Sequence, residues 1–246
     1  MFPNLKKRVP EPTEEMEGKK EVKGFLGTRN SIKRKSTFNV VRIDVLKESK
    51  LKSGKILDVG CGFGGLIKNI NHYRKGFSFV GIDLSKAMID AARKYCEGIP
   101  AIFYVKPADK TGFKTESFDL VICKDTFHHF NRPVKVLTEL YRITKKRGFI
   151  YITDLDRNTS MDLVYEEMQR LAEKRLLTSM MLYDSIQAAY TVPEMKLLFK
   201  KAGFKKYKIY TKKSGKNFVK EYNVPDAGLR NILGFIETRW VAIIRK

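Results

Sequence analysis

A glycine-rich turn between a buried strand and a helix constrains this chain more than any other feature. The segment reads Ile-Leu-Asp-Val-Gly-Cys-Gly-Phe-Gly-Gly and spans residues 56–65. Glycine lets the backbone turn sharply out of a strand and leaves no Cβ where a ligand must approach. The first amides of the following helix lack intrahelical partners and can bind a ligand. The segment therefore predicts a ligand-binding strand–turn–helix unit in an α/β fold.

Apolar strands alternate with helices on both sides of this turn. We expect a helix from Ile32, strands at 56–59, 77–83, 101–105, 118–123 and 149–153, and helices at 66–73, at 85–95 with Ser85 as N-cap, and from Pro133 to a stop at Gly148. The strands lack the strict alternation of a half-exposed sheet, so both faces of the sheet should be covered. Strands that are each followed by a helix indicate a mostly parallel sheet between two helical layers.

Two segments depart from this alternation. Residues 1–30 are polar and contain prolines, so we expect a flexible N-terminal arm. Residues 31–246 should form one domain. Within it, residues 158–190 are rich in Met, Leu and Tyr and are predicted to form a helical cap insertion of one or two helices.

The C-terminal part returns to alternating elements. Thr191 and Glu194 have capping-box spacing, and Gly203 marks a helix end, so a helix is expected between them. Final strands are expected at 204–210 and 240–244, joined by a polar loop.

Two aspartates near the glycine turn bear on the cofactor. Gly60, Gly62 and Gly65 also satisfy the spacing of dinucleotide-binding turns, so the glycines alone leave NAD open. Asp58, at the carboxyl end of its strand, would repel a pyrophosphate but would attract the ammonium and sulfonium groups of S-adenosylmethionine. Asp83 ends the next strand, where a carboxylate can accept both ribose hydroxyls of either cofactor. The electrostatics therefore favour S-adenosylmethionine.

Further segments carry a family resemblance. Val-Gly-Ile-Asp-Leu-Ser at 80–85, Ser-Phe-Asp-Leu-Val-Ile-Cys at 117–123 and Phe-His-His-Phe at 127–130 accompany the glycine turn. Together they resemble the class I S-adenosylmethionine-dependent methyltransferases, in particular the ubiquinone- and menaquinone-biosynthesis subgroup. The resemblance implies a Rossmann-like α/β fold whose seven strands take the order 3-2-1-4-5-7-6, with the last strand antiparallel. It is weak for the substrate, because this subgroup methylates quinols, sterols, other metabolites and macromolecules.

The residues that would hold the methyl donor follow from the motifs and the resemblance together. They are Asp58, Gly60, Cys61, Gly62, Gly64, Asp83, Leu84, Ala108, Asp109 and Cys123. The family usually has Gly-Asp-Ala after its third strand, with the aspartate on the adenine amino group. Here Lys106-Pro107-Ala108 occupies that position and Asp109 comes two residues late. Either Asp109 or backbone groups near Ala108 would therefore meet the adenine.

Two adjacent histidines are the candidates for catalysis. His128 and His129 follow the strand at 118–123, beyond whose carboxyl end the acceptor would meet the donor. An imidazole titrates near neutral pH and can act as a general base or orient the acceptor. The pair can equally cap a helix or pack under the sheet, so both interpretations stay open.

Cysteine usage and charge limit the remaining functions. The three cysteines are widely spaced without a CxxC pair, so we predict no disulfide framework and no metal site, and we expect a cytoplasmic protein. No apolar run is long enough to span a bilayer. The net charge of +22 is dispersed along the chain and lacks the interleaved aromatic residues of a single-strand-binding face.

The substrate prediction follows from this balance. We predict a small-molecule acceptor. The alternative is methylation of RNA or protein through a basic surface, since the charge keeps a nucleic-acid partner open. A more remote alternative is an NAD- or nucleoside-binding protein without methyltransferase activity.

Overall fold

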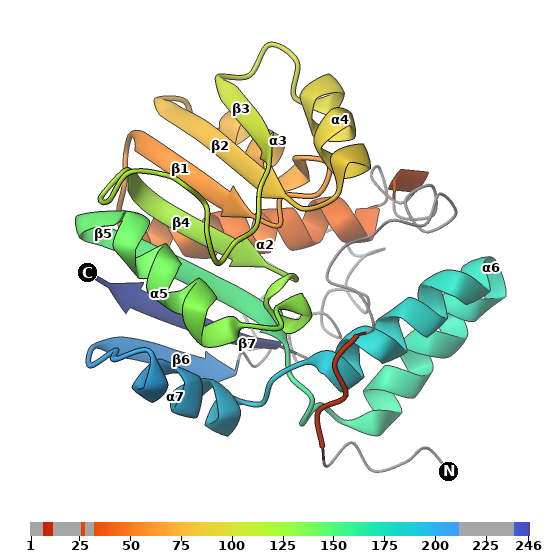
Figure 1. The fold of residues 1–246 in the computed structure, drawn as a ribbon. Helices are drawn as coiled ribbons and strands as arrows, with labels where there is room; N and C mark the ends of the chain where they lie inside the picture. Colours follow the sequence, from red (N-terminus) through yellow and green to blue (C-terminus); the bar gives the residue numbers. More distant parts are fainter. Residues whose placement is uncertain (1–6, 12–25, 28–31, 212–238) are drawn as a thin grey trace.

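A seven-stranded sheet in the order β3-β2-β1-β4-β5-β7-β6 forms the centre of the molecule (Figure 1). The computed structural model describes residues 7–11, 26–27, 32–211 and 239–246. The strands are β1 (Gly54–Val59), β2 (Phe77–Asp83), β3 (Ala101–Val105), β4 (Phe118–Lys124), β5 (Thr144–Leu155), β6 (Tyr207–Thr211) and β7 (Arg239–Arg245). Strands β1 to β5 pair in parallel, whereas β7 runs antiparallel to both β5 and β6. The predicted order and the antiparallel last strand are confirmed.

Helices cover both faces of this sheet. They are α2 (Ile32–Ser49), α3 (Gly65–Tyr73), α4 (Lys86–Tyr95), α5 (Pro133–Ile143), α6 (Met161–Ala188) and α7 (Val192–Lys201), with a short 3-10 helix η1 (Phe127–His129). Helices α2, α3 and α4 share one core with Ile56 and Ile122, while α5 and α7 share the other with Leu57 and Val121. Consecutive strand residues thus enter opposite cores, which explains why the strands are apolar without alternation.

Helix α6 lies apart from the two helical layers, beyond the carboxyl ends of the parallel strands (Figure 1). It is one helix of 28 residues where the sequence allowed one or two. Val164 near its start and Ile186 near its end pack with Leu155 at the end of β5. Among the described residues, no helix is long and apolar enough to cross a membrane.

The junction between α5 and β5 corrects one prediction. The helix expected to run to Gly148 ends at Ile143, and Gly148 lies within β5. The Thr144 hydroxyl donates to the carbonyl of Leu140 at 2.7 Å, and Thr144 already pairs with Phe118 of β4. The following basic residues suit a helix surface and an exposed strand start equally well, so only the pairing with β4 decides where the helix ends.

The predicted caps are confirmed. The Ser85 side chain accepts a hydrogen bond from the Met88 amide at 3.4 Å, and Thr191 and Glu194 form a complete capping box. The predicted stop at Gly203 has a positive φ of 78°. The loop between the last two strands and most of the predicted N-terminal arm lie outside the described residues, so the division at residue 30 stays a prediction.

Candidate active site

The glycine turn after β1 is fixed by its neighbours on both sides. The Gly60 amide donates to the carbonyl of Ile82 in β2 at 2.8 Å. Gly60 has a φ of +67°, and a Cβ placed there would lie 2.2 Å from Cγ2 of Thr126, in the loop after β4. The positive φ and this close approach both require glycine. The turn is therefore closely packed at the carboxyl ends of β1, β2 and β4.

Asp83 at the end of β2 is bound to the same turn. Its Oδ2 accepts from the Gly62 amide and its Oδ1 from the Ser85 amide, each at 2.9 Å. Burial raises the pKa of Asp83, while the two amide donors act in the opposite direction. A carboxylate offers about four acceptor positions, so these two bonds leave capacity for hydroxyl donors. The predicted contact of Asp83 with the ribose hydroxyls stays a prediction.

Asp58 lies one strand away, with its backbone in register between Gly81 of β2 and Ile122 of β4. Its side chain is only 3% exposed. Burial raises the pKa of Asp58 to about 7, Lys124 acts to lower it, and the negative charge of Asp83 raises it further. A buried carboxylate with this pKa gains strongly from a cation placed beside it.

The other predicted donor-binding residues differ in what they expose. Cys61 and Ala108 are buried, and Leu84 is half-buried. The Cys123 side chain is fully buried in the core shared with α5, so a ligand could be reached there only through the backbone. Burial raises the pKa of its thiol well above the usual range, which fits a structural cysteine and not a nucleophile.

Asp109 already has a partner in the loop after β3. Its carboxylate forms an ion pair with the guanidinium of Arg132 at 2.7 Å. The Asp109 side chain is mostly buried, whereas that of Arg132 is exposed. An adenine amino group would therefore share this carboxylate with Arg132, and the choice between Asp109 and the backbone near Ala108 stays a prediction.

His128 occupies the short helix η1 directly after β4 and is held by Asp154 near the end of β5. The Nδ1 atom of His128 lies 2.7 Å from Asp154 Oδ1, and the His128 amide donates to Asp154 Oδ2 at 2.9 Å. Both side chains are almost completely buried. Burial lowers the pKa of His128, but the carboxylates of Asp154, Glu11 and Asp125 together outweigh this effect and the net shift is upward. Asp154 thus fixes the orientation of the imidazole.

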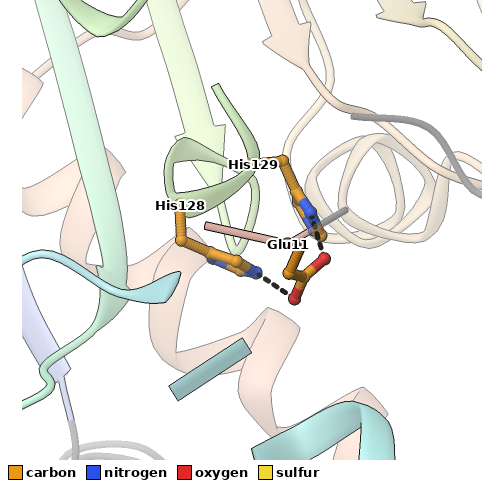
Figure 2. A group of neighbouring side chains, drawn as sticks. All are labelled: Glu11, His128 and His129. Atoms are coloured by element: carbon orange, nitrogen blue, oxygen red, sulfur yellow. Dashed lines mark ion pairs between the residues drawn. The ribbon is translucent and has the colours of Figure 1, made fainter. Parts of the chain in front are cut away.

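A third acidic residue joins the two histidines. Glu11 lies between the two rings, pointing toward both (Figure 2). Its Oε2 is 2.7 Å from His129 Nδ1, and its Oε1 is 3.8 Å from His128 Nε2. The two rings are stacked with centroids 4.1 Å apart. Sequence reasoning did not single out Glu11, because it lies far from the histidines in the chain.

Residues 7–11 reach the histidines by packing along the end of α6. The Arg8 guanidinium donates to the carbonyls of Ala188 and His128 at 2.6 and 2.7 Å and lies over the ring of Tyr190. The Ser185 hydroxyl donates to Glu11 at 2.8 Å. We call residues 7–11 the N-terminal strap. The strap therefore contacts both η1 and the C-terminal end of α6.

The central part of the chain is similar to known methyltransferases. Residues 57–152 match the family model described as a methyltransferase domain. The ubiquinone biosynthesis O-methyltransferase of Hahella chejuensis is 31% identical over 125 residues, which are 49% of this chain and 52% of that protein. Phthiotriol/phenolphthiotriol dimycocerosates methyltransferase 1 of Mycobacterium ulcerans is 25% identical over 133 residues, 52% of this chain and 49% of that protein. The chain spans about half the length of the curated relatives it matches.

A solved structure extends the likeness to almost the whole chain. The plantazolicin methyltransferase BpumL, crystallised with a monoazolic desmethylPZN analog and SAH, has a TM-score of 0.68. The match covers 93% of this chain and 90% of that one at 20% identity. At this identity the comparison shows a shared fold.

Proposed function

We propose that the chain, whose residues 57–152 match a methyltransferase domain, is a class I S-adenosylmethionine-dependent methyltransferase that transfers a methyl group to a small-molecule acceptor. One observation carries the proposal. The glycine turn, the buried Asp58, the half-buried Asp83 and two histidines lie at the carboxyl ends of adjacent strands, where ligands bind in open α/β sheets. This arrangement supports a donor side, formed by the glycine turn, Asp58 and Asp83, and an acceptor side, formed by His128, His129 and the residues around them.

The donor side would bind the cofactor through complementary charge and hydrogen bonds. Asp83 would accept from the ribose hydroxyls while keeping its bonds to Gly62 and Ser85. Asp58 would be ionised by the ammonium of the methionine moiety, because that cation offsets the desolvation of its carboxylate. The turn at Gly60 would let the backbone approach the ligand closely.

The acceptor side would align the nucleophile. The donor itself supplies the electrophilic carbon, so the protein mainly brings the acceptor atom in line with the sulfur–carbon bond. The acceptor atom attacks the methyl carbon, the carbon–sulfur bond breaks, and S-adenosylhomocysteine leaves with the electron pair. His129 is near enough to the donor side that its charge lowers the pKa of Asp83, which supports a place beside the reacting atoms.

The acceptor side favours a small molecule. The strap contacts η1 and α6, and the side chains of His128 and His129 are 3% and 28% exposed. The matched relatives are named for ubiquinone biosynthesis and for phthiotriol dimycocerosates. The second candidate, methylation of RNA or protein, rests on the net charge of +22. Cysteines 61, 96 and 123 are free and buried, which suits the cytoplasmic location inferred from the sequence.

Calorimetry with S-adenosylhomocysteine and with NAD tests the cofactor. We expect the chain to bind the former and not the latter. Asp83→Ala should weaken binding of S-adenosylhomocysteine more than about tenfold, because two hydrogen bonds to a half-buried carboxylate are lost. Asp90→Ala, which removes an exposed carboxylate on α4, is the matched control and should leave the affinity unchanged. Absence of binding by the unmodified chain would refute the proposed function.

Transfer of labelled methyl groups tests the acceptor class. The chain is incubated with labelled S-adenosylmethionine and either a metabolite extract or total RNA. Label in the metabolite fraction is the expected result. Label in RNA, lost steeply as the salt concentration rises, would instead establish the polyanion alternative.

A further inference from the structure

We propose that Glu11, His128 and His129 form a binding site for a divalent transition-metal ion of the Zn²⁺ class. One ligand atom from each residue lies within 4.8 Å of the other two. Two imidazole nitrogens and one carboxylate are a ligand set that Zn²⁺ commonly uses in catalytic sites. The sequence predicted no metal site because that prediction rested on the absence of a CxxC pair. This cluster contains no cysteine, and it forms only because the strap packs onto η1.

The distances suit an ion placed between the three side chains. The carboxylate oxygens of Glu11 are 2.7 Å from one imidazole nitrogen and 3.8 Å from the other. Bond lengths of about 2.1 Å around a tetrahedral Zn²⁺ place two ligand atoms about 3.4 Å apart. These two separations bracket this value and the third, between the two imidazole nitrogens, is at most 4.8 Å, so rotations of the side chains would be needed to create the site. Figure 2 shows both rings directed at the carboxylate from the same short helix.

The state of the His128 ring is an independent observation that points to a cation. Asp154 accepts from Nδ1, so the lone pair of a neutral imidazole would be on Nε2, which faces Glu11. His128 is 3% exposed, and its Nε2 has no hydrogen-bond partner among the described residues, whereas His129 Nδ1 lies 2.7 Å from Glu11 Oε2. A lone pair facing a carboxylate is repulsive, and either a proton on Nε2 or a metal ion between the two groups would remove that repulsion.

Asp154 also has the position of a carboxylate that supports a metal-bound histidine. Metal-binding histidines almost always donate their second ring N–H to a carboxylate, a carbonyl or water, which fixes the tautomer and increases ligand basicity. The distance of 2.7 Å between His128 Nδ1 and Asp154 Oδ1 fits this arrangement. The ligand and its supporting carboxylate are thus both present before an ion binds.

The charges around the cluster also favour a cation. Asp125 and Asp154 both act electrostatically on His128, and Asp184 lies near enough to Glu11 for their charges to interact. The facing positive charges are those of Arg8, which donates to the His128 carbonyl, and of Lys124 and Arg239, which pair with Asp125. The carboxylates of Glu11 and Asp154 are thus not neutralised by an ion pair to Lys or Arg among the described residues.

Three protein ligands leave coordination positions open, as in catalytic metal sites. If the proposed methyl transfer holds, on which this step rests, an acceptor hydroxyl would take an open position. The ion would then lower the pKa of that hydroxyl, and its proton would leave to solvent before the oxygen attacks the methyl carbon. The substrate class is accordingly a hydroxyl-bearing small molecule.

Metal titration tests the site without any methyl donor. The full chain, free of a polyhistidine tag and stripped with a chelator, is titrated calorimetrically with Zn²⁺, and Co²⁺ absorption then reports tetrahedral coordination. We expect one ion per chain and at least a tenfold loss of affinity in Glu11→Gln and in His129→Gln. The matched control is His72→Gln, because His72 is the remaining histidine and lies exposed at the end of α3.

The outcomes separate the metal site from the proposed function. Absence of Zn²⁺ binding by the unmodified chain, or equal affinity in Glu11→Gln, His129→Gln and the control, would overturn the proposal. Thermal unfolding of each variant without metal shows whether it folds, and Zn²⁺ should raise the unfolding temperature of the unmodified chain but not that of Glu11→Gln. Binding of S-adenosylhomocysteine to Glu11→Gln should be unchanged. Failure of the metal titration with intact cofactor binding would reject only the metal site.

Discussion

The two sides of the candidate site are built in different ways. On the donor side, Gly62 and Asp83 belong to consecutive elements and their hydrogen bond spans 21 positions of the chain. On the acceptor side, the bond between Arg8 and the Ala188 carbonyl spans 180 positions, and that between Arg8 and His128 spans 120. The donor side therefore depends mainly on neighbouring elements, with Thr126 after β4 packed against Gly60, whereas the acceptor side forms only when more distant segments pack around η1.

This difference suggests a division of roles. A local unit of strand, turn and helix can bind the same cofactor whatever surrounds it. The acceptor side can change with α6 and the strap while the sheet stays constant. Substitutions should therefore affect one side at a time, and each of the following experiments tests that independence.

The largest effect is expected where the glycine turn is most crowded. Gly60→Ala should lower the free energy of unfolding by about 3 kcal/mol, because the new Cβ meets Thr126 at 2.2 Å and the left-handed backbone disfavours a side chain. Gly98→Ala is the control, since Gly98 has a φ of +76° with nothing within 4 Å of the added Cβ. It should lose only about 1 kcal/mol. Equal losses in urea denaturation would show that the contact with Thr126 does not constrain the turn.

The acceptor side is tested most sharply through Asp154. Asp154→Asn should weaken Zn²⁺ binding about 10- to 100-fold, because the amide no longer fixes the His128 tautomer as a carboxylate does. Binding of S-adenosylhomocysteine should stay within about twofold of that of the unmodified chain, since the hydrogen bonds of the Asp154 carboxylate go to His128 and Leu155. A parallel loss of both affinities would show that the two sides are coupled.

The same division explains what the sequence could predict. Asp83, the glycine turn and the Ser85 cap were recognisable because each depends on neighbours within one strand–turn–helix unit. The partners of His128 were not, because Glu11 and Asp154 reach it through tertiary packing that leaves no spacing pattern. The end of α5 was mispredicted for a related reason, since Thr144 takes up strand pairing with β4 only in the assembled sheet.

A pH titration sharpens the donor side further. Burial raises the pKa of Asp58 to about 7, so the cofactor-free chain holds a proton there that a bound ammonium must displace. Affinity for S-adenosylhomocysteine should therefore fall about tenfold from pH 8 to pH 6, and Asp58→Asn should abolish the dependence. The sign for folding is the reverse. The folded chain retains a proton that the unfolded chain releases, so the contribution of Asp58 to stability decreases as pH rises from about 4 to about 7.

The smallest effect concerns the joint between α6 and α7, where a local and a distant interaction converge on Glu194. Thr191 forms the capping box with Glu194 within one helical turn, and the buried Arg157 reaches the same carboxylate at 2.5 Å from outside the helix. Thr191→Ala should lower the free energy of unfolding by about 1 kcal/mol, as is usual for the loss of an N-cap, with both ligand affinities unchanged. Thr138→Ala, on the exposed face of α5, is the control and should have almost no effect. If Thr191→Ala instead weakened Zn²⁺ binding, the cap of α7 would be part of the acceptor side. A local interaction within α7 would then affect the site that distant segments form.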